Sequence, residues 1–395
     1  MSQTDVQAPG RPGLAPEAGP SRPSGQGSAR LYALDALRVV AALSVLVFHF
    51  TGIDAATKAN WGVNPRELFP WLFPVTTYGS YGVQLFFIIS GFVICLSAWD
   101  RTPGQFVRAR FLRLFPAYWF SIVVGVLVWR GLPDGQRKAP SISDSLTNVT
   151  MLQVPLQARH VVGSYWTLWV ELTFYLIFLV VLWKGLDYMR VSVFCWVWLL
   201  AGVLVQQDQH IPLVGIFAQP LNTALFVSGI AMYLMYRFGP NLMLWGLLGA
   251  SWLVMQSDLI QHADGLRKEG YDRSPYVALA LVTVFYLLVL AVALRKLAWV
   301  RWKWLATAGA LVYPLYLLHE ELGWALIREL YGHLGAWATL GVTTAALIVL
   351  SWLVHRFVER PAQRWLRDRL ARESRMPPGS RAGEGSPMEA RPRGA

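Results

Sequence analysis

Long runs of hydrophobic residues, rarely broken by a charge, follow one another along most of the chain. A helix needs about 20 mainly apolar residues to cross the hydrocarbon core of a bilayer. Stretches of about this length recur along the sequence and predict an all-α protein, a polytopic membrane helical bundle. The ten predicted segments are 31–50, 79–99, 114–130, 165–183, 191–206, 213–236, 241–257, 275–294, 305–327 and 337–355.

The two ends of the chain lack this hydrophobic pattern. Residues 1–30 are rich in Pro, Gly, Ser and Ala, and residues 366–395 are basic and rich in Pro and Gly. Segments of such composition bury too little apolar surface to fold. We therefore expect a disordered tail at 1–30, a membrane domain at 31–365 and a second tail at 366–395.

The composition agrees with a membrane protein. Hydrophobic residues make up 55% and charged residues 15% of the chain, against about 45–50% and about 25% in soluble domains. These values exclude an intrinsically disordered chain and disfavour a soluble globular enzyme. The 19 Trp, 19 Phe and 15 Tyr residues suit interfacial aromatic belts. The two cysteines, Cys95 and Cys195, lie in apolar runs and indicate neither a disulfide framework nor a metal site.

The excess of basic over acidic residues indicates how the chain is oriented in the membrane. The chain carries 35 Lys and Arg against 23 Asp and Glu, a formal charge of +12 that could also indicate nucleic acid. Ten spans place both termini on one side, and with that side in the cytoplasm 25 of the 35 basic residues lie in inside segments. This distribution follows the positive-inside rule. We therefore expect cytoplasmic termini and no nucleic-acid partner.

The first hydrophobic segment carries Arg38 and His49. They are eleven positions apart, which leaves them about 20° apart around a helix and about 16 Å apart along it. Charged groups inside membrane helices are costly and indicate function by default. The alternative is that Arg38 snorkels to the inner interface and that His49 lies at the outer one.

The fourth segment contains Glu171, six residues from its outer end and so at the depth of His49. A carboxylate and an imidazole at one depth could form an acid–base pair. Alternatively, Thr167, Tyr175 or another helix satisfies the carboxylate. An unpaired carboxylate in hydrocarbon is expensive, which weakens any interpretation that leaves it without a partner.

Three arginines, Arg108, Arg110 and Arg113, lie where the third segment leaves the cytoplasm. Arg110 and Arg113 are three residues apart and share a helical face. Guanidinium groups on one face suit the recognition of phosphate. The alternative is that these residues are ordinary positive-inside anchors.

Two later segments also carry polar residues. His319, Glu320 and Glu321 lie in the ninth segment past mid-membrane, where His319 could equally be a packing histidine bonded to a tyrosine. Glu359 follows the last segment beside a basic cluster and could be part of a salt-bridged helix end. Pro361 is expected to end that helix.

Together these segments resemble the acyltransferase-3 family of bacterial integral-membrane acyltransferases. The resemblance covers roughly residues 30–365, and six weak motifs in the expected order make it specific. The motifs are Arg38 and His49 after Leu34-Asp35; GSYGVQLFFIISGF from Gly79 to Phe92; Arg110 and Arg113 before RLFPAYW; Trp166, Thr167, Leu168, Glu171, Phe174 and Tyr175; Tyr313, Leu315, Tyr316, Leu317 and His319; and Glu359, Arg360 and Pro361.

The resemblance implies an enzyme of the bacterial inner membrane. Such an enzyme would transfer an acyl group, most often acetyl, from acyl-coenzyme A to a hydroxyl group. Acceptors implied by it are sugars, envelope glycans and other small molecules, with no hydrolase-like domain appended here. Ala36 and Val39 depart from the family's frequent glycines, and Gln84 stands where many members have aspartate.

These observations combine into one mechanistic hypothesis. Arg110 and Arg113, with Arg108 beside them, bind the phosphates of the donor, and Arg38 lies further along the same path. His49 deprotonates the acceptor hydroxyl or carries the acyl group as a nucleophile, and the sequence leaves both roles open. Glu171 orients His49 or stabilises its charged form. Since no phosphate loop, Ser-His-Asp motif or metal-ligand spacing is present, we expect an enzyme that uses no metal.

Two other classes of protein compete with this interpretation. A transporter or flippase would also contain buried arginine, histidine and glutamate residues. It would not explain the cytoplasmic arginine pair together with the Trp-Thr-Leu-x-x-Glu stretch. A catalytically silent membrane scaffold gains nothing from the buried ionisable groups at His49 and Glu171.

Overall fold

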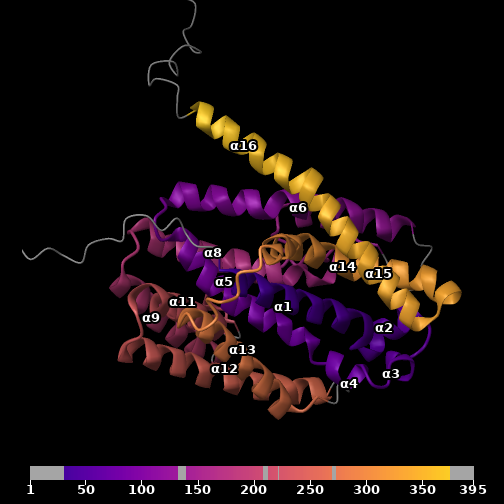
Figure 1. The fold of residues 1–395 in the computed structure, drawn as a ribbon, viewed down its shortest axis with the longest axis horizontal. Helices are drawn as coiled ribbons and strands as arrows, with labels where there is room; N and C mark the ends of the chain where they lie inside the picture. The colour runs from indigo at the N-terminus through magenta and orange to yellow at the C-terminus, as the bar shows by residue number, and fades with distance from the viewer. Residues whose placement is uncertain (1–30, 132–138, 208–211, 221, 269–272, 374–395) are drawn as a thin grey trace, which may run out of the picture. The chain divides into compact units, whose positions relative to one another are not determined.

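A computed structural model describes residues 31–131, 139–207, 212–220, 222–268 and 273–373. All regular elements in these ranges are helical, as Figure 1 shows, which confirms the all-α prediction. The predicted tail at 1–30 and residues 374–395 of the second tail lie outside the described residues.

The helices follow the predicted segments closely. The elements are α1 Tyr32–Thr51, α2 Asp54–Trp61, α3 Pro65–Leu68, α4 Phe73–Thr76, η1 Gly79–Tyr81, α5 Gly82–Ala98, α6 Pro103–Gly131, α7 Ile142–Val149, η2 Gly163–Tyr165, α8 Trp166–Trp183, α9 Tyr188–Gln207, α10 Pro212–Ala218, α11 Thr223–Phe238, α12 Leu242–Lys268, α13 Pro275–Ala293, α14 Trp304–Leu334, α15 Ala336–Val354, the π-turn η3 His355–Glu359, and α16 Arg360–Glu373.

Seven helical stretches of the described chain are long and apolar enough to cross a membrane. Two further apolar helices, Thr223–Phe238 and Leu242–Ser257, are shorter. Several membrane-spanning helices are thus confirmed, whereas a total of ten spans stays a prediction. The seven stretches are Tyr32–Thr51, Phe73–Ala98, Pro103–Gly131, Gly163–Trp183, Tyr188–Val205, Pro275–Ala293 and Ala336–Trp365.

The predicted single span at 213–236 is wrong, because the chain turns between α10 and α11. Gln219 has a φ of 45°, in the left-handed region, and Pro220 has no N–H to continue a helix. The Gln219 side chain donates a hydrogen bond to the carbonyl oxygen of Val170 in α8, at 2.9 Å. Hydrophobicity does not detect this turn, since both sides of it are apolar.

Two helix boundaries differ from the predicted ones with consequences for charged residues. α6 begins at Pro103, so the arginines at 108, 110 and 113 lie within its first three turns. Pro361 does not end a helix. Helical structure instead continues from α15 through the π-turn His355–Glu359 into α16, with Pro361 just after that turn. The first residues of the predicted second tail are therefore helical, up to Glu373.

Close packing between α5 and α11 depends on two glycines. A Cβ atom at Gly91 would collide with the backbone oxygen of Phe226, and one at Gly229 with that of Ile88. Small residues let membrane helices approach closely and gain dispersion contacts. The α5–α11 pair therefore forms a firm wall beside α1, which also packs on α5.

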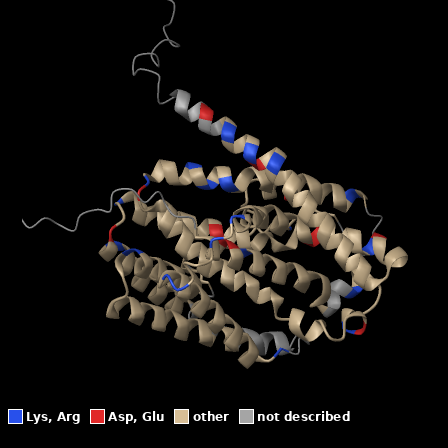
Figure 2. Ribbon diagram, viewed as in Figure 1, with Lys and Arg blue, Asp and Glu red and all other residues tan. Residues whose placement is uncertain are grey.

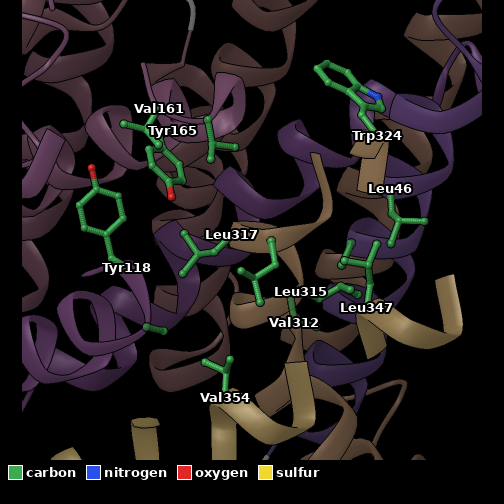
Figure 3. Close-up of a cluster of buried hydrophobic side chains, with 14 of the residues drawn as sticks. Leu46, Tyr118, Val161, Tyr165, Val312, Leu315, Leu317, Trp324, Leu347 and Val354 are labelled. Carbon is green, nitrogen blue, oxygen red and sulfur yellow. The ribbon is translucent and has the colours of Figure 1, made fainter. Parts of the chain in front are cut away.

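A cluster of buried hydrophobic residues joins α1, α6, α14 and α15. Figure 3 shows Leu46 of α1 near Leu347 of α15, and Tyr118 of α6 beside Tyr165. The ring centres of the two tyrosines are 4.9 Å apart. Most charged residues lie instead at helix ends and along α16, and a few lie in the middle of the bundle, as Figure 2 shows. These few interior charges mark the candidate site.

Candidate active site

Three neighbouring cavities follow one another through the bundle. The basic cavity, about 770 Å³, includes Arg101, Gln105, Arg108, Arg110 and Arg113. The middle cavity, about 80 Å³, includes Arg38, Ser90, Arg113, Glu171, Tyr313 and Tyr316. The histidine cavity, about 490 Å³, includes His49, Ser80, Tyr81, Gln84, Ser164, Arg273, Tyr316 and Glu320.

Shared wall residues show that the three cavities adjoin. Arg113 lines both the basic and the middle cavity. Val83 and Tyr316 line both the middle and the histidine cavity. Arg38 and His49 therefore lie on adjoining cavities along α1, as expected from their common helical face.

The basic cavity is built from the end of α5 and the first turns of α6. Arg108 and Arg113 are exposed, whereas Arg110 is buried and donates a hydrogen bond to the Ser97 hydroxyl. The Arg110 guanidinium lies over the ring of Tyr175, 5.6 Å from its centre. Its Nε atom is buried and has no hydrogen-bond partner in the described part of the chain. An anion could accept from this nitrogen, because a guanidinium has several fixed donors.

Glu171 belongs to the middle cavity. It accepts hydrogen bonds from the Ser90 hydroxyl, at 3.2 Å, and from the Tyr175 hydroxyl. Tyr175 is one of the partners that the sequence offered as an alternative. The cavity thus holds two guanidinium groups, Arg38 and Arg113, and one carboxylate.

The expected pairing of Glu171 with His49 is not among the hydrogen bonds of the described residues. Sequence position gave both groups the same depth but did not give the direction in which each faces. α8 packs on α5 and α6, whereas α1 packs on α5 and α14. The partner of His49 is consequently supplied by α14.

His49 and His319 form a contact between α1 and α14. Nδ1 of His49 lies 3.2 Å from Nε2 of His319, and the ring centres are 4.8 Å apart. Nδ1 of His49 also lies 2.8 Å from the carbonyl oxygen of Val45, one turn earlier. The indole N–H of Trp324 donates to the carbonyl oxygen of His49 itself, at 3.0 Å. α14 therefore fixes both the ring and the backbone of His49.

These contacts assign the proton positions in the neutral histidine pair. A carbonyl oxygen only accepts, so Nδ1 of His49, beside Val45, carries a hydrogen. Nδ1 of His319 lies 2.7 Å from the carbonyl oxygen of Tyr316 and carries one for the same reason. Nε2 of His319 then accepts from His49. Nε2 of His49 is left unprotonated, with no hydrogen bond from any described residue, on a ring that lines the histidine cavity.

The carboxylate of the histidine cavity is Glu320, next to His319 on α14. The backbone N–H of Ser164 donates to its Oε2 atom, at 2.5 Å. Gly163 allows this approach, because a Cβ atom there would collide with the Glu320 carboxylate. The sequence identified Glu320 as an interior charge but assigned no role to it.

Arg273 reaches the same cavity from the segment before α13. Its side chain is 5% exposed and donates to the hydroxyls of Thr77 and Ser80, both at 3.2 Å. The guanidinium also lies over the ring of Phe48, 5.1 Å from its centre. The sequence placed Arg273 in an outside loop and gave no signal for burial, since its partners are almost 200 residues earlier.

The segment that leads into Gly163 and Ser164 is held by its own polar network. The Ser141 hydroxyl and N–H both donate to the Asp144 carboxylate at the start of α7 and lower the pKa of that group. The N–H of Arg159 also donates to Asp144, at 3.1 Å. The Asn148 side chain donates to the carbonyl oxygen of Arg159, at 2.8 Å. This network ties the chain just before the cavity to α7.

Glu359 is a buried helix-end residue, as the sequence allowed. It lies in the π-turn and pairs with Nδ1 of His355, at 2.6 Å. The turn contacts α6 and α14. Within the described residues, no group of three His, Cys, Asp or Glu side chains is arranged to hold a metal ion.

A family model described as an acyltransferase domain, Acyl_transf_3, matches residues 31–356. The chain is 26% identical over 381 residues to "Acyltransferase MdmB" of Streptomyces mycarofaciens, covering 85% of this chain and 92% of that relative. No solved structure matches. The family match spans α1 to the π-turn and confirms the resemblance seen in the motifs, so the chain belongs to this acyltransferase family and is an acyltransferase enzyme with membrane-spanning helices.

Proposed function

We propose that the protein is an O-acyltransferase of the bacterial inner membrane that moves an acyl group, in the first place acetyl, from acyl-coenzyme A to a hydroxyl group. The acceptor is a sugar, an envelope glycan or another small molecule. If the chain has the predicted ten spans with both termini in the cytoplasm, the basic cavity lies on the cytoplasmic side. The observation that carries the proposal is the row of three adjoining cavities. The row begins at the basic cavity, with its four arginines and Gln105, and ends at the histidine cavity, with His49.

The basic cavity suits the nucleotide end of the donor. Arg108 and Arg113 are exposed there, and the buried Arg110 keeps one unpartnered N–H donor. Guanidinium groups bind phosphate with charge-assisted hydrogen bonds. A pantetheine arm, on the order of 15–20 Å long, then matches the rise of about 16 Å from Arg38 to His49. The thioester would thereby reach the histidine cavity while the phosphates stay among the arginines.

His49 has the proton arrangement of a general base. Its Nε2 takes the proton of the acceptor hydroxyl while that oxygen attacks the thioester carbonyl carbon. The carbon–sulfur bond breaks, and the leaving sulfur recovers the proton from Nε2. The carbonyl oxygen of Val45 and Nε2 of His319 share the Nδ1–H of His49 and stabilise the charged ring that forms between the two proton transfers.

The donor is tested first with purified protein in lipid nanodiscs. Coenzyme A should raise the melting temperature, and acetyl-coenzyme A should release free thiol when an acceptor is present. Absence of thermal stabilisation by coenzyme A would remove the donor assignment and favour the transporter interpretation. Dephospho-coenzyme A, which lacks one phosphate, serves as the matched ligand and should stabilise the protein less.

The acceptor is tested in cells. Mass spectra of envelope glycans and secreted metabolites are compared between cells with and without the gene product. A difference of one acyl group identifies both the acceptor and the acyl chain. Identical spectra, together with active thiol release in vitro, would contradict a role in modifying these molecules.

A further inference from the structure

Three polar atoms in the wall of the histidine cavity are buried and unpartnered. They are the hydroxyl of Tyr81, Oε1 of Gln84 and the hydroxyl of Ser164, and within the described residues none has a hydrogen-bond partner. Tyr81 is 2% exposed and Ser164 is 4% exposed. Most buried polar groups in proteins have a partner, so three exceptions on one cavity call for an explanation.

The three atoms come from separate elements that meet at this cavity. Tyr81 ends η1, Gln84 lies in the first turn of α5, and Ser164 lies in η2. The backbone of Ser164 is fully used, because its N–H donates to Glu320 and its carbonyl accepts from Thr167 and Tyr316. The Ser164 hydroxyl is therefore left over on a residue whose position is fixed.

The chemistry of the three atoms describes their ligand. The amide oxygen of Gln84 can only accept, whereas the hydroxyls of Tyr81 and Ser164 can donate or accept. A ligand that satisfies all three must donate at least one hydrogen bond and offer further polar groups nearby. Neighbouring hydroxyl groups on a ring or chain meet this requirement. A lone hydroxyl does not, because in the proposed reaction its one hydrogen goes to Nε2 of His49 and none is left for the amide oxygen of Gln84.

We propose that Tyr81, Gln84 and Ser164 determine acceptor specificity by binding hydroxyl groups that flank the reacting one. This inference rests on the proposed function, since it assigns the histidine cavity to the acceptor. The cavity of about 490 Å³ has room for such a molecule beside His49. Among the buried side-chain atoms of the described residues on these cavities, Nε of Arg110 at the donor end is also unpartnered, so each substrate has its own set of unused groups.

The proposal is tested by binding, without turnover. Methyl glycosides of glucose, galactose and mannose are added to the coenzyme-free protein in nanodiscs, and saturation-transfer NMR reports contact. Cyclohexylmethanol, of similar size with one hydroxyl, is the matched probe. At least one glycoside should bind more tightly than cyclohexylmethanol. Equal signals from all four probes, or none from any glycoside, would overturn the proposal.

The residues are tested by Tyr81→Phe, Gln84→Leu and Ser164→Ala. Each should weaken glycoside binding by about three- to tenfold, the usual effect of one hydrogen bond. Because the removed atoms bond to no described residue, the melting temperature should stay or rise. Tyr118→Phe is the control, since the Tyr118 hydroxyl donates to the carbonyl oxygen of Asn148 at 2.7 Å and its loss should lower the melting temperature.

Two outcomes separate this inference from the proposed function. Stabilisation by coenzyme A should be unchanged in all three variants, because none of these residues lines the basic cavity. If glycosides fail to bind while coenzyme A still stabilises the protein, the specificity assignment is wrong and the donor assignment stands. The assignment of these residues would also be overturned if a variant that combines all three substitutions bound glycosides as tightly as the wild type.

Discussion

The basic cavity and the histidine cavity lie at the two ends of one row, yet they are assembled in different ways. The arginines at 108, 110 and 113 come from the first turns of a single helix, α6. The histidine cavity collects His49, Ser164, Arg273 and Glu320 from four distant parts of the chain. The three arginines of the basic cavity thus need only local spacing along one helix, whereas the histidine cavity depends on the packed bundle.

The largest effect is expected from the histidine end. His49→Ala should lower acyl transfer by about 10²- to 10⁴-fold, the usual loss when a positioned general base is removed. Thermal stabilisation by coenzyme A should remain, because His49 lies outside the basic cavity. Thiol release measures the rate. His333→Ala, at the exposed end of α14, is the matched control and should behave as wild type. Near-normal transfer by His49→Ala would contradict the role of this residue.

Substitutions in the basic cavity should weaken binding of the donor without slowing the chemical step. Arg113→Ala should raise the KM for acetyl-coenzyme A by about tenfold, since a hydrogen bond to a charged group contributes about 1.5–3 kcal/mol, and leave kcat largely unchanged. Arg113 is preferred to the buried Arg110, whose removal would also leave Ser97 and Tyr175 without their contact. Arg301→Ala, exposed and outside all three cavities, is the control. An unaltered donor KM in Arg113→Ala would remove the phosphate assignment.

A smaller effect is expected at His319, which acts through His49. His319→Phe removes one of the two acceptors of the His49 Nδ1–H, leaving the carbonyl oxygen of Val45, and should lower kcat by about tenfold with little change in either KM. His319→Gln keeps an accepting oxygen and should recover part of the rate. The pH profile of kcat should change in the phenylalanine variant and return toward wild type in the glutamine variant. A purely structural role would lower stability in both variants without altering that profile.

The smallest effect is expected at Glu171, for which the sequence allowed either His49 or Tyr175 as a partner and the structure has a hydrogen bond from Tyr175. Glu171→Gln keeps an acceptor for the Ser90 and Tyr175 hydroxyls and removes one charge from the middle cavity. The donor KM should change by about threefold, consistent with a weak interaction, while the pH profile of kcat stays as in wild type. A displaced pH profile would show that Glu171 acts on His49 after all.

Much of the fold could be predicted from hydrophobicity, because a helix in lipid must satisfy its own backbone and cover itself with apolar side chains. Arg38 and His49 were placed on one face because they belong to one helix. The turn at Gln219 escaped prediction, since neither its φ nor its contact with Val170 leaves a hydrophobic signature.

The parts of the site that sequence did not reveal are contacts between distant segments. His49 and His319 are 270 residues apart, and the burial of Arg273 depends on Thr77 and Ser80. Depth in a membrane can be inferred from position in a hydrophobic run, but rotation and neighbours cannot. For that reason the sequence left the partner of Glu171 open between His49 and residues such as Tyr175, and it identified Glu320 without a role.

The constriction between the two larger cavities has a consequence for transport. At about 80 Å³, the middle cavity is too small for a nucleotide. In the proposed reaction only the slim pantetheine arm of the donor would pass it, while the adenine end would be retained. In the proposed reaction, each cycle would export a small carbonyl fragment and return the carrier to the compartment where it is recharged. Energy stored by metabolism on one side of the bilayer would then drive ester formation on the other, without any nucleotide being lost from the cell.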